Sequence, residues 1–250
     1  ISNKNNSELV NFLRSIGIDI LIDINGIFGK GRIGIFNSRV CRLQMSWVGY
    51  NNTIGLKHSD YLIADRNLIP ENEKNLYKEK IIYLNGIWSS HSGLNIERKF
   101  NKLPSQKSDF FTLGSFNNYT KISDETINVW TEILKKIKNS KLILKSSVTY
   151  SEIHFKEIFK REGVLSKVIF KNRPKNFEEH INLYKDIDLC LDTFPYTGVT
   201  TTCEALWMNV PVISMAGFNF NSRCGESILI NSDLKDLVAE NKDDYISKVV

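Results

Sequence analysis

The chain has no long hydrophobic run. None of its 250 residues lies in an apolar stretch close to the roughly 18–20 residues that a membrane span needs. The first six residues, Ile-Ser-Asn-Lys-Asn-Asn, are polar and lack the apolar core of a secretory signal. An initiator methionine is also missing, so we expect the chain to be part of a longer protein. These absences predict a protein without a membrane span.

Cysteine is scarce and scattered. The four cysteines, Cys41, Cys190, Cys203 and Cys224, form no Cys-x-x-Cys pair, and no histidine stands near them at metal-ligand spacing. This pattern argues against a structural zinc site and against a disulfide framework. A reducing compartment follows as the expectation, and we predict a cytoplasmic protein.

The charge balance has only a small excess of one sign. Lys and Arg number 33 against 28 Asp and Glu, a net charge of +5, and the lysines are scattered along the chain rather than massed. Such a distribution suits a small anionic ligand better than a nucleic-acid duplex, so we expect no nucleic-acid partner. The share of hydrophobic residues, 42%, is that of a folded protein with one large domain or two small ones.

The second half alternates short apolar segments with helical patterns. Ser123 is placed to cap the first helix, and Asp124 and Glu125 stand in its first turn, where the helix dipole favours negative charge. Five buried strands separated by helices predict a doubly wound α/β domain with a parallel sheet. The expected strands are 110–115, 141–145, 167–170, 187–192 and 211–215, and the expected helices are 127–137, 151–161, 177–185 and 200–208.

The first half is less regular and resembles the later part of a second α/β domain whose beginning is missing. The expected strands are 19–24, 43–48, 60–65 and 80–84, and the expected helices are 7–16 and 33–40. The polar stretch 95–108 has the composition of a linker, so we predict domains at 1–107 and 108–250. Ligands of parallel sheets collect where strands end, which directs attention to the loops at Ser115, Ser146, Asn172 and Thr193.

A strand, a loop and a threonine-rich helix follow one another in residues 191–208. Thr200, Thr201 and Thr202 follow a loop that contains Pro195 and Gly198, and they stand in the first helical turn, where hydroxyls and free backbone N–H groups can bind phosphate. Glu204, one turn later, can accept hydrogen bonds from the two hydroxyls of a ribose. The alternative is an ordinary capped helix with Glu204 facing solvent.

A second polar loop follows the strand at 110–115. Asn117, Asn118 and Lys121 would project into the same crevice as the threonine turn, because both loops leave the same edge of the sheet. Lys121 is a point charge suited to a leaving pyrophosphate, and Asn118 can bind an amide or hydroxyl edge. The alternative is a polar turn with a solvated lysine.

Two further residues stand at the same end of the sheet. His180 lies near a helix start before the strand at 187–192, although a lone histidine is more often structural than catalytic. Arg223 opens another helix and could meet either a phosphate or a helix-end carboxylate.

Several of these motifs, in this order, resemble the catalytic region of the O-linked N-acetylglucosamine transferases and the related SPINDLY-type protein O-fucosyltransferases. The resemblance rests on residues 114–122, 191–208, 210–213 and 222–223, and in the first half on 19–26, 44–50, 60–65 and 79–81. It implies a GT-B architecture of two Rossmann-like lobes, with 1–107 the rear part of the acceptor-side lobe and 108–250 the nucleotide-sugar lobe. It also implies tetratricopeptide repeats upstream.

The resemblance further implies inverting transfer of N-acetylglucosamine from UDP-N-acetylglucosamine to Ser or Thr of an acceptor protein, without metal or other cofactor. Lys121 would stabilise the leaving diphosphate as the catalytic residue. The donor-binding residues implied are Asn118, His180, Thr200, Thr201 and Glu204, with Asn117, Gly198, Thr202 and Arg223 as further candidates. GDP-fucose is the alternative donor, and a non-catalytic nucleotide-sugar-binding fragment is the alternative function.

The chain also departs from the family pattern. Val199 and Ile27 stand where many relatives have histidine, so the roles of those histidines have no counterpart here. Phe177 replaces a lysine expected three residues before His180, and nearby Lys175 is a candidate substitute. The upstream part of the first lobe is absent, and no general base is assigned.

Overall fold

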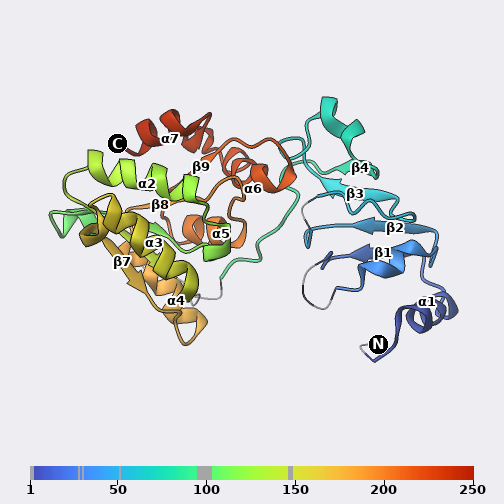
Figure 1. Cartoon of the computed structure of the whole chain (residues 1–250). Helices are drawn as coiled ribbons and strands as arrows, with labels where there is room; N and C mark the ends of the chain where they lie inside the picture. Colours follow the sequence, from blue (N-terminus) through green and yellow to red (C-terminus); the bar gives the residue numbers. More distant parts are fainter. Residues whose placement is uncertain (1–2, 28, 30, 51, 95–102, 146–148) are drawn as a thin grey trace. The chain divides into compact units, whose positions relative to one another are not determined.

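The protein divides into two compact units, residues 1–90 and 91–250 (Figure 1). The computed structural model describes residues 3–27, 29, 31–50, 52–94, 103–145 and 149–250. Residues 95–102 of the expected linker and the loop residue Ser146 lie outside this part of the chain. Among the described residues, no helix combines the length and the hydrophobicity that crossing a membrane requires.

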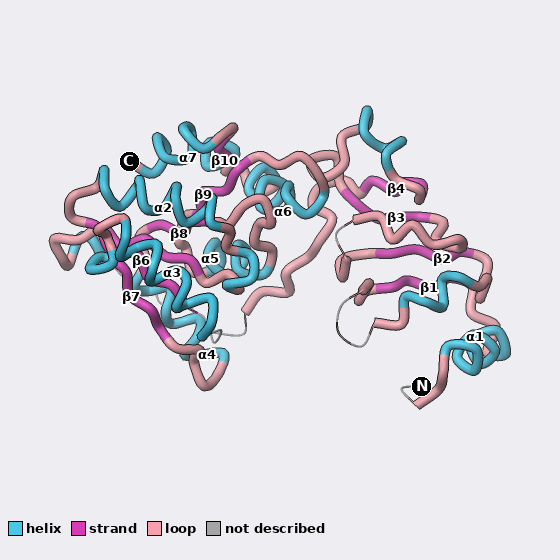
Figure 2. The backbone as a smooth tube through the Cα atoms, viewed as in Figure 1, coloured by secondary structure: helices cyan, strands magenta, loops and turns pink. Residues whose placement is uncertain are grey.

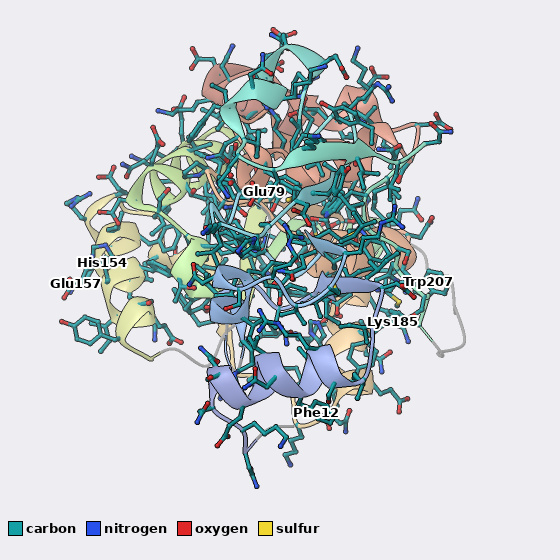
Figure 3. All side chains as sticks on the ribbon, turned by 90° about the vertical axis from the view of Figure 1, so that its right-hand side faces the viewer. Phe12, Glu79, His154, Glu157, Lys185 and Trp207 are labelled. Carbon is teal, nitrogen blue, oxygen red and sulfur yellow. The ribbon has the colours of Figure 1, made fainter. Side chains whose placement is uncertain are left out.

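The first unit is built on a parallel four-stranded sheet in the order β1-β2-β3-β4. Its strands are β1 (Ile20–Asp23), β2 (Leu43–Ser46), β3 (Tyr61–Ala64) and β4 (Lys80–Tyr83), which confirms all four predicted strands. Helix α1 (Asn6–Ser15) carries Phe12 (Figure 3) and starts at a capping box, in which Asn5 and Glu8 each accept the other's backbone N–H.

The helix predicted for 33–40 is wrong. This stretch forms only a short 3-10 turn, η1 (Ile33–Asn37), whose start has no side-chain cap. The stretch is still buried against α1 through Ile35, Phe36 and Val40. Its apolar pattern therefore indicates burial rather than a regular helix. A second 3-10 turn, η2 (Glu71–Leu76), connects β3 to β4.

The second unit is a doubly wound α/β domain, as the sequence predicted (Figure 2). Its parallel sheet has the order β10-β9-β8-β5-β6-β7. The strands are β5 (Phe111–Ser115), β6 (Ser140–Lys145), β7 (Val168–Lys171), β8 (Leu189–Leu191), β9 (Val212–Met215) and β10 (Val238–Ala239), so the predicted count of five is one too few. The missed strand, β10, has only two residues and leaves no periodic signal.

Helices cover both faces of this sheet. Trp130, Phe155 and Tyr245 pack on one face from α2 (Asp124–Lys136), α3 (Thr149–Arg161) and α7 (Lys242–Val249). Ile181, Ala205 and Leu229 pack on the other face from α4 (Phe177–Asn182), α5 (Thr200–Trp207) and α6 (Phe220–Ile230). The helix expected at 177–185 is therefore shorter, and its last turn tightens into the 3-10 turn η6 (Leu183–Asp186). Ser123 caps α2 by accepting Thr126 N–H, as predicted.

The segment before β5 belongs with the second unit. Leu94 packs against the cluster that contains Ile181, and Ser105 N–H donates to the buried Asp188 at 3.0 Å. The division at Ser90/His91 therefore precedes the boundary drawn from the sequence at 107/108. The assignment of acceptor and donor sides to the two parts stays a prediction.

Asp188 is a buried anchor, because it accepts the backbone N–H of both Ser105 and Thr112. We expect Asp188→Ala to lower the free energy of unfolding by about 1–3 kcal/mol, since truncation leaves buried N–H groups without acceptors. Chemical denaturation of the variant measures this loss. Asp186→Ala is the control, as Asp186 is exposed and its salt bridge to Lys171 lies at the surface. Equal stability of the two variants would contradict the anchoring role.

Candidate functional site

The site lies where the winding of the second sheet reverses. The chain runs outward from β5 through β6 to β7 and then returns to β8 beside β5, so the loops after β5 and β8 leave adjacent strands. Hydrogen bonds join these loops, among them Asn117 Nδ2 to Asp192 Oδ1 at 3.2 Å and Lys121 Nζ to the Thr197 carbonyl at 2.9 Å. The predicted convergence of the two loops is confirmed for Asn117 and Lys121.

Helix α5 starts differently from its neighbours. An Asn or Ser side chain caps the other helices of this unit whose start is fully described, namely α2 (Ser123), α4 (Asn176), α6 (Asn219) and α7 (Asn241). Helix α5 starts after Val199, which makes no side-chain cap. Its first backbone bond runs from Cys203 N–H to the Val199 carbonyl, so the N–H groups of residues 200–202 have no acceptor within the helix. An uncapped positive helix end favours an anion.

The three threonines of this turn differ in exposure. Thr200 is exposed, Thr201 is half-buried and Thr202 is buried. Thr201 Oγ1 donates its hydrogen to Asn117 Oδ1 at 2.8 Å, so in this structure that hydroxyl has no hydrogen left for a phosphate. The backbone N–H groups of the turn have no such partner within the helix, and phosphate binding by Thr200 and Thr201 stays a prediction.

Lys121 is held rather than solvated. Besides its bond to Thr197, its ammonium lies 4.1 Å from the ring centroid of Tyr196, a cation–π contact. Burial lowers the pKa of Lys121, and the negative charge of Asp192 opposes that shift. The alternative of a polar turn with a solvated lysine is wrong.

Glu204 faces the interior of the site. Its Oε2 lies 2.9 Å from His180 Nε2 and accepts a hydrogen bond from Tyr184 OH at 3.2 Å. The alternative of a capped helix with a solvent-facing glutamate is therefore wrong on both counts. Lys145, at the end of β6, extends the chain of contacts, with Nζ at 3.2 Å from His180 Nδ1. Burial lowers the pKa of Lys145, against a raising effect of Glu204.

This arrangement fixes the ring of His180. A lysine ammonium can only donate, so Nδ1 accepts, and Nε2 carries the hydrogen that faces the Glu204 carboxylate. We expect the neutral ring to be the Nε2–H tautomer, which long-range ¹H–¹⁵N correlation spectra of histidine-labelled protein report directly. Loss of one histidine signal set in His180→Gln gives the assignment. Finding the Nδ1–H tautomer in the ligand-free protein would contradict the arrangement.

The remaining predicted site residues have local roles in this structure. Asn118 is exposed, and its side chain caps the short turn η4 (Tyr119–Lys121) by accepting Thr120 N–H. Arg223, buried in α6, donates from Nε to the Gly217 carbonyl. Phe177 is half exposed, and the backbone N–H of Lys175 donates to Glu179. The binding roles of Asn118 and Arg223, and the substitution of Lys175 for the missing lysine, stay predictions.

Two of the other histidines make different contacts within the second unit. His154 stands on the exposed side of α3 (Figure 3), 2.7 Å from Asp124, and His91 accepts the Gly93 N–H. His58 belongs to the first unit. The four cysteines form no disulfide, and burial raises the pKa of the Cys203 thiol to about 11. The described residues contain no group of three His, Cys, Asp or Glu side chains that could hold a metal ion.

Sequence reasoning missed three residues that organise the site: Asp192, Tyr184 and Lys145. Asp192 and Lys145 each stand where a buried strand ends, and this position was a usable signal. Tyr184 lies in the apolar stretch that leads into β8 and is recognisable only through its partner, Glu204. Asp192 is fully buried, and burial raises its pKa.

The model of glycosyl transferase family 41 matches residues 3–89 and 89–250. Among curated proteins, the probable UDP-N-acetylglucosamine–peptide N-acetylglucosaminyltransferase SPINDLY of Eustoma exaltatum subsp. russellianum is 34% identical, over 97% of this chain and 27% of its own length. The protein of the same name from Arabidopsis thaliana is 32% identical, over 96% of this chain and 27% of its own length. The chain thus spans about a quarter of the relatives it matches.

A solved structure of the O-GlcNAc transferase of Thermobaculum terrenum, a point mutant, superposes with a TM-score of 0.92 at 28% identity. The match covers 98% of this chain and 47% of that chain. The similarity confirms the predicted fold class, α/β of the GT-B type.

Proposed function

Because the chain belongs to glycosyl transferase family 41, we propose that it supplies the donor site of a protein glycosyltransferase. The proposed reaction is inverting, metal-independent transfer of N-acetylglucosamine from UDP-N-acetylglucosamine to Ser or Thr of an acceptor protein. One observation carries the proposal: the uncapped start of α5 and the ammonium of Lys121 meet at the reversal point of a doubly wound sheet. Two separate positive groups there suit a diphosphate.

The proposed roles follow from this geometry. The N–H groups of the first turn of α5, with the Thr200 hydroxyl, bind the phosphates, and Lys121 stabilises the charge that develops on the leaving diphosphate. Glu204 binds the ribose hydroxyls; His180 and Tyr184 hold its Oε2 and so fix the direction of Oε1. Asn118 and His180 line the nucleotide pocket. Without a cation, the helix end and the lysine provide the compensating charge.

Nucleotide titration tests the donor. We expect calorimetry to give a lower Kd for UDP than for GDP. The Kd for UDP should not change when EDTA is added, because the groups that bind the phosphates are N–H, hydroxyl and ammonium groups rather than a metal ion. Preference for GDP would favour the second candidate, GDP-fucose, which the resemblance to both family branches supports. A UDP Kd that rises in EDTA would contradict metal independence.

Transfer itself needs a separate measurement, since a nucleotide-sugar-binding module would also bind UDP. Mass spectrometry of proteins co-expressed with the full-length protein reports the transferred sugar by its mass. We expect an added N-acetylhexosamine on Ser or Thr. Binding of UDP with neither transfer nor donor hydrolysis would favour the binding module.

A further inference from the structure

Asp192 is a buried carboxylate surrounded by hydrogen-bond donors. It is 1% exposed, and its Oδ1 accepts from Asn117 Nδ2, Thr193 N–H and Gly198 N–H at 3.2, 2.9 and 2.7 Å. Its Oδ2 accepts from Ser214 Oγ at 2.7 Å. Three of these donors carry hydrogens that cannot be turned away, so Oδ1 has no room for a proton of its own. Burial raises the pKa of Asp192, whereas the hydrogen bonds from Ser214, Gly198 and Thr193 and the charge of Lys121 oppose that shift and favour the ionised carboxylate.

The peptide group between Thr197 and Gly198 joins this carboxylate to Lys121. The carbonyl of that peptide accepts from Lys121 Nζ at 2.9 Å, while its N–H donates to Asp192 Oδ1 at 2.7 Å. A cation and an anion thus hold opposite ends of one peptide dipole, immediately before the uncapped start of α5. Each charge strengthens the hydrogen bond of the other through the polarised peptide.

The backbone of α6 packs closely against the Asp192 carboxylate at Gly225. A Cβ on Gly225 of α6 would lie 2.4 Å from Asp192 Oδ2 and 2.3 Å from Ser214 Oγ. Gly225 N–H also donates to Thr197 Oγ1 at 3.0 Å, and Thr197 Oγ1 donates to the Asn221 carbonyl. The loop that contains the Thr197–Gly198 peptide is therefore hydrogen-bonded both to α6 and to Asp192.

We propose that Asp192 is a positioning residue of the donor site, which fixes the Thr197–Gly198 peptide and keeps Lys121 charged. The proposal deepens the function proposed above and rests on it. Asp192 acts in two ways. Its negative charge stabilises the ammonium of Lys121, and its hydrogen bond from Asn117 Nδ2 orients that amide so that Asn117 Oδ1 accepts from the Thr201 hydroxyl. Neither way requires Asp192 to touch the donor.

The charges around Lys121 agree with this role. Burial lowers the pKa of Lys121, and the negative charge of Asp192 is the main group that opposes this shift. The cation–π contact with the Tyr196 ring also favours the charged form of Lys121. Without the negative charge of Asp192, less would oppose the lowering of the Lys121 pKa by burial, and this pKa would fall further. A lysine that loses its proton at lower pH loses its stabilising charge at lower pH.

The test is Asp192→Asn, which keeps the shape and the Oδ1 acceptor, while Ser214 can turn to accept from the new amide. In ¹³C-lysine-labelled, ligand-free protein, the Lys121 signal is the one absent in Lys121→Arg. We expect its titration midpoint to fall by roughly one pH unit in Asp192→Asn, the size typical for loss of a nearby opposite charge. The alkaline limb of kcat/KM should move in the same direction, because kcat/KM reports the free enzyme.

Asp188→Asn is the matched control, since Asp188 is equally buried in the same unit and also accepts two backbone N–H groups. It should leave the Lys121 midpoint unchanged. An unshifted Lys121 midpoint in Asp192→Asn overturns the proposal, as does an equal shift in the control. The NMR titration needs no sugar transfer, so it decides the Asp192–Lys121 link even where the proposed function fails.

A second measurement covers the case in which Asp192→Asn does not fold. The ¹³C carboxyl shift of Asp192 in the unaltered protein reports its ionisation. The proposal requires the ionised form at pH 7, and a carboxyl that is protonated there overturns it.

Discussion

Replacement of Lys121 with methionine is expected to lower the rate of sugar transfer by about 10²–10³-fold, the typical cost of removing one group that stabilises developing negative charge. Methionine fills similar space without the ammonium, so the leaving diphosphate would keep only the start of α5 as a positive partner. The effect should be on kcat more than on KM, because the diphosphate charge increases as the glycosidic bond breaks. Steady-state kinetics with a peptide acceptor measure both.

Lys135→Met is the matched control. Lys135 lies on α2 in the same unit, is about half exposed and pairs with Glu162 at the surface. Its loss should change the rate little, as for most exposed positions. Thermal unfolding of both variants separates a catalytic effect from misfolding. A Lys121→Met protein that transfers sugar at the unaltered rate would eliminate the role assigned to this lysine.

The fold was predictable wherever the signal is local. The four strands of the first unit and the first five of the second are short apolar runs between polar turns. The start of α2 was predictable because Ser123 is a typical N-cap residue. Strand β10 was missed because two residues cannot show a period. The stretch 33–40 was misjudged because Ile35, Phe36 and Val40 are buried without a helical backbone, so tertiary packing overrode the local pattern.

The candidate site was predictable in part for the same reason. Thr200, Thr201 and Lys121 lie in the turns that follow two strand ends, and that position is visible in the sequence. The contacts that hold them are not visible, because Asp192 meets Asn117 across 75 residues and His180 meets Glu204 across 24. Burial of Glu204 and Lys121 is likewise a tertiary property. Local chemistry thus located the site, whereas the partners of each side chain required the fold.

The second large effect is expected at Gly198, where there is no room for a side chain. An added Cβ would lie 2.6 Å from Thr201 Oγ1, 2.7 Å from Thr202 Oγ1 and 3.1 Å from Asn117 Oδ1. Gly198→Ala must therefore turn the Thr201 and Thr202 hydroxyls away, which breaks the hydrogen bond from Thr201 to Asn117, or displace the loop from the first turn of α5. We expect the Kd for UDP to rise by roughly 10- to 100-fold, and overpacking to lower the free energy of unfolding by about 1–3 kcal/mol. Calorimetry and denaturant unfolding measure the two effects.

A double-mutant cycle with Thr201→Ala separates the collision from any other effect of the new methyl group. Thr201→Ala removes the nearest colliding atom and, alone, loses the hydrogen bond to Asn117. Since the two positions are in contact, their effects should not add: Gly198→Ala should cost clearly less in the Thr201→Ala background. An equal cost in both backgrounds would mean that the methyl group acts elsewhere. Relief by Thr201→Ala would show that the new methyl group acts through its collision with the Thr201 hydroxyl, and so that close packing of this loop on the helix start supports binding of the diphosphate.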